Sequence, residues 1–347
     1  MKKLICFIFC LGILQLSCSD DNPIPPPPPD EDTGTLLINY GLNAHWVTLF
    51  WSKNSNELFT AGKKGIQAID LSTRSTRTIE GNDGVNNTLG NSMALSNDGN
   101  KFYYMLTGPG SYGPLYSISI HGQDRQLLVG SDCSDLCLSL DDLHLAYRAY
   151  HPSSEELADS LYIYKIDSRE KKFLCIGRPI TFSPDSRSLL YYYWTHPDTT
   201  PSQSSFVSYS ITSIENGEVY PISIDTPYYY KVPKFFCDNS GIYVLYNPEM
   251  LQCSVRNITT NETVFTWTQN VYTYSPSYTF STLGKKIAFW TSAWGEYELC
   301  LIDLSSKKES RIAYSKQKCG SHSIAFSPDY SKIAYVFGEG IYMKDIP

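Results

Sequence analysis

A short pattern recurs through most of the chain at nearly constant spacing. An apolar segment ends in a small residue, an Asp often follows two positions later, and a second apolar segment begins soon afterwards; the clearest copies are residues 180–185 (ITFSPD) and 324–329 (IAFSPD). The small residue stands at seven positions, which are Ser52, Ser96, Ser139, Ser183, Cys237, Ser281 and Ser327. Intervals of 43 to 54 residues separate successive copies, a length typical of one repeated supersecondary unit.

Apolar residues follow each copy in the same register. Six residues after the small residue stand Leu58, Phe102, Leu145, Leu189, Tyr243, Ile287 and Ile333. Eight residues after it stand Thr60, Tyr104, Tyr147, Tyr191, Leu245, Phe289 and Tyr335. A spacing of two places both positions on the same face of a β-strand. The Pro and Asp between the apolar segments suit a tight turn, so each copy predicts a strand–turn–strand hairpin.

The motif Phe-Ser-Pro-Asp, followed by an apolar–Ala–aromatic strand, resembles the WD40-like repeat called PD40. That repeat occurs in the TolB propeller and, more loosely, in the N-terminal propeller of dipeptidyl peptidase IV-like proteins. The resemblance covers residues 35–347 and is strongest in the fourth and seventh copies. It implies an all-β fold, a seven-bladed β-propeller with four strands in each blade.

The number of strands predicts how the ring closes. After Ser327 the chain has room for two strands, at residues 332–337 and 340–346. The segment 35–40 (TLLINY) lies ahead of the first copy and is a spare strand. We expect it to complete the seventh blade, because closure removes exposed strand edges. An open or eight-bladed arrangement is the alternative.

The N-terminus resembles that of a bacterial lipoprotein. Residues 1–17 read as a signal peptide, with Lys2 and Lys3 ahead of an apolar stretch. Residues 14–18 (LQLSC) resemble a lipobox, which implies lipid attachment at Cys18, although Gln15 replaces the usual aliphatic residue. The alternative is an ordinary secretory signal followed by a Cys that occurs there by chance.

A tether follows the predicted lipid. Residues 18–34 are acidic and Pro-rich, and such segments favour an extended polyproline II conformation. The acidic residues directly after Cys18 are similar to the export signal of surface lipoproteins in bacteria of the Bacteroidetes type. We therefore expect the domain, residues 35–347, to be held by lipid in the outer membrane and to face the cell surface. The periplasmic face is the alternative.

Charge and motifs exclude several functions. The chain has 35 acidic and 28 basic residues, a formal net charge of −7, whereas a nucleic-acid partner requires a basic surface. The sequence contains no Gly-x-Ser-x-Gly motif and no phosphate-binding Gly-rich loop. These observations favour a non-catalytic, monomeric propeller with no cofactor and no nucleic-acid partner.

The resemblance to PD40 propellers also predicts a binding face. In such propellers the loops between second and third strands share one face with the connections from each outer strand to the next inner strand; we call this the long-loop face. An insertion at residues 195–205 and several other long loops fall there. The candidate binding residues on it are Tyr112, His151, His196, Tyr228, Tyr229, Tyr230, Tyr272, Tyr274 and Trp294. Aromatic rings bind sugars and anchor protein interfaces, although tyrosines equally suit blade packing.

Three functions are consistent with this sequence. The first is a non-catalytic propeller that binds a glycan or a protein partner through the long-loop face. The second is a propeller-fold enzyme such as a polysaccharide lyase, which would use an acidic cluster or the histidines predicted on that face, namely His45, His151, His196 and His322. These histidines have no metal-ligand spacing, so no metal is expected. The third is a periplasmic assembly factor similar to TolB.

The cysteines beyond Cys18 leave their pairing open. Seven follow it in the chain, an odd number, so at least one is unpaired within the monomer. Cys133 and Cys137 are near enough in sequence for a disulfide to be considered, but the geometry of a strand opposes it.

Overall fold

Antiparallel strands make up the regular structure of the chain, and no helix occurs among the residues that the structure describes. The computed structural model describes residues 33–40, 47–81, 88–107, 112–149, 159–195, 206–222, 234–235, 241–247, 252–257, 260, 262–268, 278–281, 285–293, 296–315 and 323–346, all within the compact unit Glu31–Pro347. A helix long and apolar enough to span a membrane is likewise not found in these ranges.

Five sheets have four strands each. The first contains β2 (Thr48–Trp51), β3 (Glu57–Gly62), β4 (Gly65–Asp70) and β5 (Thr76–Glu80). The next two contain β13 (Arg178–Phe182), β14 (Ser188–Thr195), β15 (Phe206–Ser213) and β16 (Val219–Ile222), then β17 (Lys234–Phe235), β18 (Gly241–Asn247), β19 (Gln252–Asn257) and β20 (Thr263–Thr268). The last two contain β21 (Tyr278–Ser281), β22 (Lys286–Ala293), β23 (Glu296–Asp303) and β24 (Lys308–Ser315), then β25 (Ile324–Phe326), β26 (Lys332–Phe337), β27 (Gly340–Asp345) and β1 (Thr35–Asn39).

A sixth sheet has seven strands because two four-stranded sets share one long strand. Its members are β6 (Thr88–Leu95), β7 (Lys101–Thr107), β8 (Gly113–Ser119), β9 (Gln126–Leu138), β10 (His144–Ala149), β11 (Ser160–Lys165) and β12 (Lys171–Ile176). The first part of β9 pairs with β8, and its second part pairs with β10. β9 is therefore both the outer strand of one set and the inner strand of the next.

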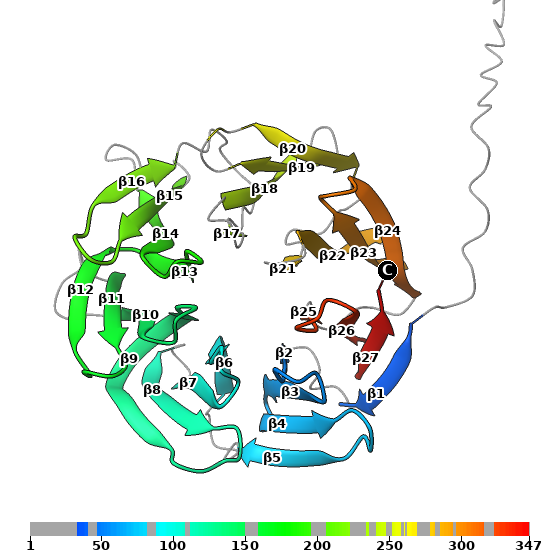
Figure 1. Cartoon of the computed structure of the whole chain (residues 1–347), viewed down its shortest axis with the longest axis horizontal. Coiled ribbons are helices and arrows are strands. Elements are labelled where there is room, and N and C mark those ends of the chain that lie inside the picture. Colours follow the sequence, from blue (N-terminus) through cyan, green and yellow to red (C-terminus); the bar gives the residue numbers. More distant parts are fainter. Residues whose placement is uncertain are drawn as a thin grey trace, which may run out of the picture. The chain divides into compact units, whose positions relative to one another are not determined.

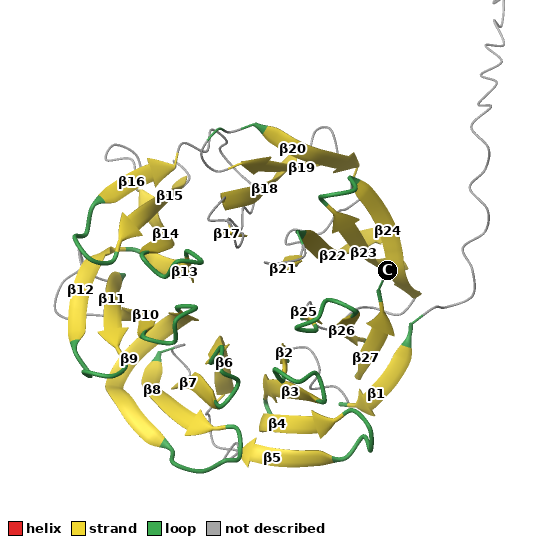
Figure 2. Cartoon of the chain, in the orientation of Figure 1, coloured by secondary structure: helices red, strands yellow, loops and turns green. Residues whose placement is uncertain are grey.

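The four-stranded sets succeed one another around a central axis within this unit (Figure 1). The first strand of each set lies innermost and the fourth outermost, as the labels β2 to β5 and β13 to β16 show (Figure 1; Figure 2 colours the same strands by structure). We call each set a blade and number the blades along the chain from β2. Arg148 thus belongs to blade 3, and Arg178 to blade 4.

The N-terminal strand is paired as the sequence predicted. β1 runs antiparallel to β27, with Thr35 opposite Met343 and Asn39 opposite Gly340. Leu37 is only 5% exposed in this sheet, and the Tyr335 hydroxyl donates a hydrogen bond of 2.6 Å to the backbone carbonyl of Thr33. The count of seven blades and the closure of the ring stay predictions.

Hydrophobic clusters fill the spaces between neighbouring blades. Phe59 on β3 meets Phe102 on β7 edge-to-face, with ring centroids 5.0 Å apart. All the described side chains six and eight residues after the small residue of the repeat are at most 3% exposed, so the predicted register is confirmed for them. Many of the abundant tyrosines, among them Tyr104, Tyr147 and Tyr335, are buried here.

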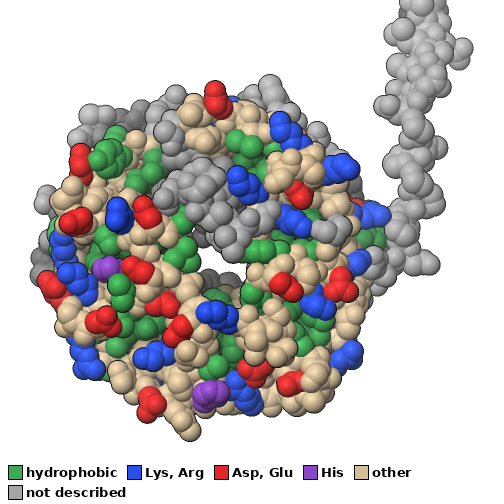
Figure 3. Space-filling view, viewed as in Figure 1, with side chains coloured by type: hydrophobic (Ala, Val, Ile, Leu, Met, Phe, Trp, Pro, Cys, Tyr) green, Lys and Arg blue, Asp and Glu red, His purple; other side chains and the backbone are tan. Residues whose placement is uncertain are grey.

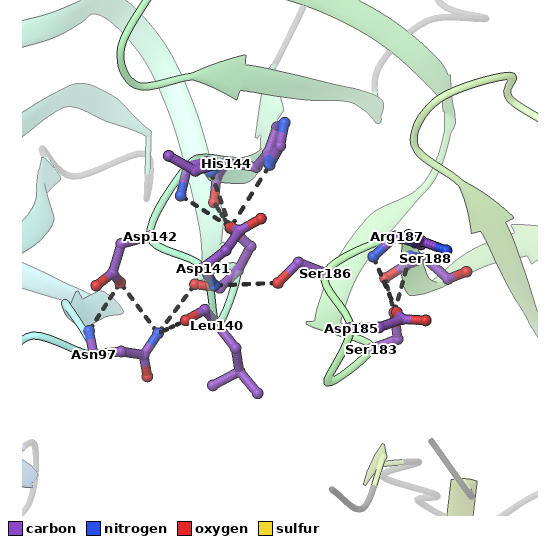
Figure 4. A network of polar contacts seen from close by, with 12 residues as sticks. Asn97, Leu140, Asp141, Asp142, His144, Ser183, Asp185, Ser186, Arg187 and Ser188 are labelled. Atoms are coloured by element: carbon purple, nitrogen blue, oxygen red, sulfur yellow. Dashed lines mark hydrogen bonds and ion pairs between the residues drawn. The ribbon is translucent and has the colours of Figure 1, made fainter. Parts of the chain in front are cut away.

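The turn of the repeat is held by its serine and its aspartate. The Ser183 hydroxyl donates to Asp185 Oδ1 at 2.6 Å and accepts from the backbone N–H of Ser188 at 2.9 Å, while Asp185 accepts from the N–H of Arg187 (Figure 4). The same contacts recur at Ser96, Ser139 and Ser327, where the aspartates are Asp98, Asp141 and Asp329.

Successive turns also contact one another. Asp142 stands third after Ser139 with φ at 59°, and its carboxylate accepts from the backbone N–H of Asn97 at 2.8 Å in the preceding blade (Figure 4). On the face drawn in Figure 3, acidic and basic side chains are interspersed over the described residues. We call the face that carries these turns the turn face; it is opposite the long-loop face because the turns occupy the other ends of the same strands.

Candidate binding site

Most residues predicted for the binding face fall outside the part of the chain that the structure describes. Tyr112 is described. The residues that lie outside are Cys18, His45, His151, His196, Tyr228, Tyr229, Tyr230, Tyr272, Tyr274, Trp294 and His322. Tyr112 therefore provides the starting point for the site, and its contacts lead to charged residues that the sequence analysis did not single out.

Tyr112 directly precedes β8 and lies beneath an arginine of the next blade. The guanidinium carbon of Arg148 lies 4.8 Å from the centroid of the Tyr112 ring, within the range of a cation–π contact. Arg148 stands near the end of β10, and its side chain is only 7% exposed. A charged group buried to this degree requires partners of opposite charge.

Two carboxylates and a hydroxyl provide those partners. Arg148 Nε donates to Ser134 Oγ at 2.6 Å and lies 3.0 Å from Asp135 Oδ2. Its Nη1 donates to Asp159 Oδ1 at 2.7 Å. The guanidinium plane is thereby fixed between β9 and the start of β11.

Asp159 joins Arg148 to a second arginine. Its other oxygen, Oδ2, accepts from Nε of Arg178, the first residue of β13, at 3.1 Å. Burial disfavours the charge on Arg178, but the Tyr192 side chain and the Asp159 carboxylate outweigh this effect and raise its pKa. The Tyr192 ring centroid lies 5.9 Å from the Arg178 guanidinium carbon. We call Tyr112, Ser134, Asp135, Arg148, Asp159, Arg178 and Tyr192 the Arg148 cluster.

The backbone is irregular where it forms the Arg148 cluster. Asp135 has φ at 48° within β9, and the pairing of β9 with β10 shifts register between Tyr147 and Arg148. Gly177, just before Arg178, donates its N–H to the Asp159 carbonyl at 2.6 Å. A Cβ on Gly177 would lie 2.5 Å from the Tyr191 ring, and its φ of 151° is rarely adopted by other residues. Only glycine allows this close approach.

The repeat itself contains a signal for this site. Arg148 stands nine residues after Ser139, and the residues at the same position in the other copies are apolar or aromatic: Ala61, Met105, Tyr192, Tyr246, Trp290 and Val336. Blade packing therefore does not require a charge here. A buried charge that departs from the pattern of its repeat is characteristic of a functional site. The contact partners Asp135, Asp159 and Arg178 have no comparable signal in the sequence.

The Arg148 cluster has balanced charge and no metal-ligating geometry. Two arginines face two carboxylates, and the aromatic rings of Tyr112 and Tyr192 lie beside the guanidinium groups. Groups of three or more His, Cys, Asp or Glu side chains placed to hold a metal ion are not found in the described residues. Cys175 and Cys300 are free thiols. Cys133 packs into the core on one side of blade 3 and Cys137 on the other, so the disulfide considered from the sequence does not join these two residues.

Comparison with known proteins identifies the fold. No protein-family model matches the chain, and no curated protein matches it in sequence. Among solved structures, an oligogalacturonate lyase in complex with manganese superposes with a TM-score of 0.63 at 12% identity, covering 88% of this chain and 89% of the lyase. An oligogalacturonate lyase from Vibrio parahaemolyticus gives 0.63 at 13% identity, covering 88% of this chain and 93% of that one.

A third similarity is to the protein named in the sequence resemblance. TolB from Acinetobacter baumannii superposes with a TM-score of 0.51 at 13% identity, covering 86% of this chain and 76% of TolB. The fold thus defines the class: the chain is an all-β protein of the propeller kind. More particularly, its fold is similar to that of the TolB propeller, and at these identities the comparisons establish the fold alone.

Proposed function

We propose that this chain is a lipid-anchored, non-catalytic β-propeller that binds a glycan through its long-loop face. One observation carries the proposal: Arg148 is buried at a position where the other copies of the repeat have apolar or aromatic residues, and it is linked through Asp135 and Asp159 to a second arginine, Arg178. The cluster lies at the strand ends from which the loops between second and third strands of blades 2 and 3 emerge. Long loops on a rigid scaffold commonly carry binding sites.

The chemistry of the Arg148 cluster suits a polar ligand with hydroxyl groups. Arginine only donates hydrogen bonds and an ionised aspartate only accepts them. The pair can therefore bond both the oxygen of a sugar hydroxyl, as acceptor, and its hydrogen, as donor. Tyrosine rings add apolar faces on which a sugar ring can pack. Charge alternation within the cluster also holds each side chain in place, which limits the entropy lost on binding.

The N-terminal segment supports the location that we propose. Cys18 would carry the lipid in the outer membrane, and residues 18–34 would form the tether between the membrane and the propeller. A polyproline II segment of 17 residues extends by about 3.1 Å per residue, or roughly 50 Å. Such a spacer would place the long-loop face clear of the membrane and within reach of polysaccharides outside the cell.

A glycan array tests the proposal, with an affinity pull-down from outer-membrane and culture-medium proteins in parallel. Binding to one related group of oligosaccharides by the whole protein, with no turnover of the bound sugar, is the expected result. Capture of a single protein partner with no glycan binding would show that the ligand of the long-loop face is a protein and not a glycan. Cleavage of a bound polysaccharide would overturn the non-catalytic assignment and support a lyase or other enzyme.

A further inference from the structure

We propose that the Arg148 cluster is a subsite for a neutral, hydroxyl-rich sugar, and that it discriminates against sugars that carry carboxylate or sulfate groups. This inference rests on the proposed glycan-binding function and adds the class of sugar. It follows from three properties of the cluster: its position across three blades, the donors and acceptors that remain available, and its charge balance.

The cluster spans three neighbouring blades at the same end of their strands. Tyr112 precedes β8 in blade 2, Arg148 stands near the end of β10 in blade 3, and Arg178 begins β13 in blade 4. Asp135 and Asp159 lie between them, at β9 and just before β11. A ligand on this surface therefore contacts a platform held by the packing of three blades, and such a platform is stiffer than a single loop.

Among the described residues, some donors and acceptors of the Arg148 cluster make no internal contact. Arg148 uses Nε and Nη1 for Ser134, Asp135 and Asp159, and within the described part of the chain its Nη2 makes no hydrogen bond. The side chains of Asp135 and Arg178 are 38% and 28% exposed. The Nη2 group of the nearly buried Arg148 and the partly exposed carboxylate of Asp135 match the acceptor and donor of neighbouring sugar hydroxyls.

The charge balance excludes an acidic ligand. Arg148 and Arg178 are already neutralised by Asp135 and Asp159, each at salt-bridge distance. A carboxylate or sulfate placed there would meet two fixed carboxylates in a partly buried setting, where like charges repel strongly. A neutral hydroxyl forms the same hydrogen bonds without this repulsion. The partly exposed Tyr112 and Tyr192 sidechains extend the surface with aromatic rings.

Isothermal titration of the purified protein tests this inference with size-matched probes. Maltohexaose, cellohexaose, mannohexaose and xylohexaose are the neutral probes, and hexagalacturonate is the acidic one. The variants are Arg178→Gln and Asp135→Asn. Arg77→Gln is the matched control, because Arg77 pairs with Glu57 at 3.0 Å in blade 1 on the turn face. Thermal unfolding confirms that each variant is folded.

We expect at least one neutral hexasaccharide to bind and hexagalacturonate to bind at least tenfold more weakly. Arg178→Gln should weaken neutral binding at least tenfold, whereas Arg77→Gln should leave it unchanged. Asp135→Asn removes one negative charge, so it should reduce or reverse the difference in affinity between the neutral hexasaccharides and hexagalacturonate.

Two results overturn the inference while preserving the glycan-binding function. One is tight binding of hexagalacturonate by the unaltered protein; the other is neutral binding that the folded Arg178→Gln and Asp135→Asn variants retain in full. If no saccharide in the probe set or on the array binds, the proposed function fails together with the inference.

Discussion

Removal of the Asp159 carboxylate should destabilise the protein more than removal of the arginine that it neutralises. Asp159 contacts Arg148 Nη1 at 2.7 Å and Arg178 Nε at 3.1 Å. In Asp159→Ala both arginines lose this partner, and the side chain of Arg148 is only 7% exposed. Breaking a buried ion pair from one side costs about 3–5 kcal/mol. Because Asp135 still neutralises Arg148, we expect a loss of about 3 kcal/mol in the free energy of unfolding.

The substitution Arg148→Met should be far milder. Met105 occupies the same repeat position in blade 2 and is fully buried, so a methionine suits the packing there. The charge left at Asp135 costs little, because its side chain is 38% exposed and can be solvated by water. Asp159 keeps its contact with Arg178 in this variant. We expect a change below about 1 kcal/mol, and in the Arg148→Met background Asp159→Ala should cost only about 1 kcal/mol.

Urea denaturation of the two single variants and the double variant measures these values as a double-mutant cycle. Thermal unfolding provides a second readout, since about 3 kcal/mol corresponds to a melting temperature lowered by about 6–12 °C. Glu57→Ala, which breaks a more exposed pair with Arg77, is the control and should cost less than about 1 kcal/mol. Additive effects of Asp159→Ala and Arg148→Met, with no coupling between them, would refute the account of a linked charge cluster.

Three further predictions concern the anchor and the turns. Cys18→Ser should move the protein from the membrane fraction to the soluble fraction and abolish labelling with radioactive palmitate; continued labelling would exclude Cys18 as the lipid site. Ser183→Ala removes a hydroxyl that bonds Asp185 and the Ser188 N–H, so unfolding in urea should become easier by about 1–2 kcal/mol, and an unchanged midpoint would contradict this role. Hydrogen bonds from the Ser327 and Ser331 hydroxyls and the Ser331 N–H lower the pKa of Asp329 to about 2. A lowered folded-state pKa stabilises the protein above the unfolded pKa near 4, and the effect is lost as pH falls towards 2. Asp329→Asn should therefore be less stable than the unaltered protein at pH 6 and equally stable near pH 2. An equal loss of stability at both pH values would argue against a lowered pKa of Asp329.

The repeat register could be predicted from sequence because it depends on local pattern. Buried positions such as Leu58 and Tyr104 recur two apart after each copy, and the turn chemistry of Ser183 and Asp185 is contained in six residues. The pairing of residues 35–39 with β27 followed from counting strands. The structural comparisons confirmed the all-β propeller fold, whereas the count of seven blades and the closure of the ring stay predictions.

The site could be predicted only in part, because its contacts join distant parts of the chain. Tyr112 and Arg178 are 66 positions apart, and they join the same cluster only after the blades have packed side by side. The shift of register beside Arg148 and the left-handed backbone at Asp135 also decide which side chains meet. Neither feature follows from the average pattern of the repeat. The departure of Arg148 from that pattern was visible in the sequence, but its partners were not.

A crystal structure of the protein with its tightest-binding neutral oligosaccharide would show whether the Arg148 cluster is the glycan-binding site. We predict a sugar ring packed within about 4 Å of Tyr112 or Tyr192. We also predict a sugar hydroxyl at about 3 Å from Arg178, Asp135 or Nη2 of Arg148. A sugar bound on the turn face, or along the outer strands of the blades, would contradict these predictions.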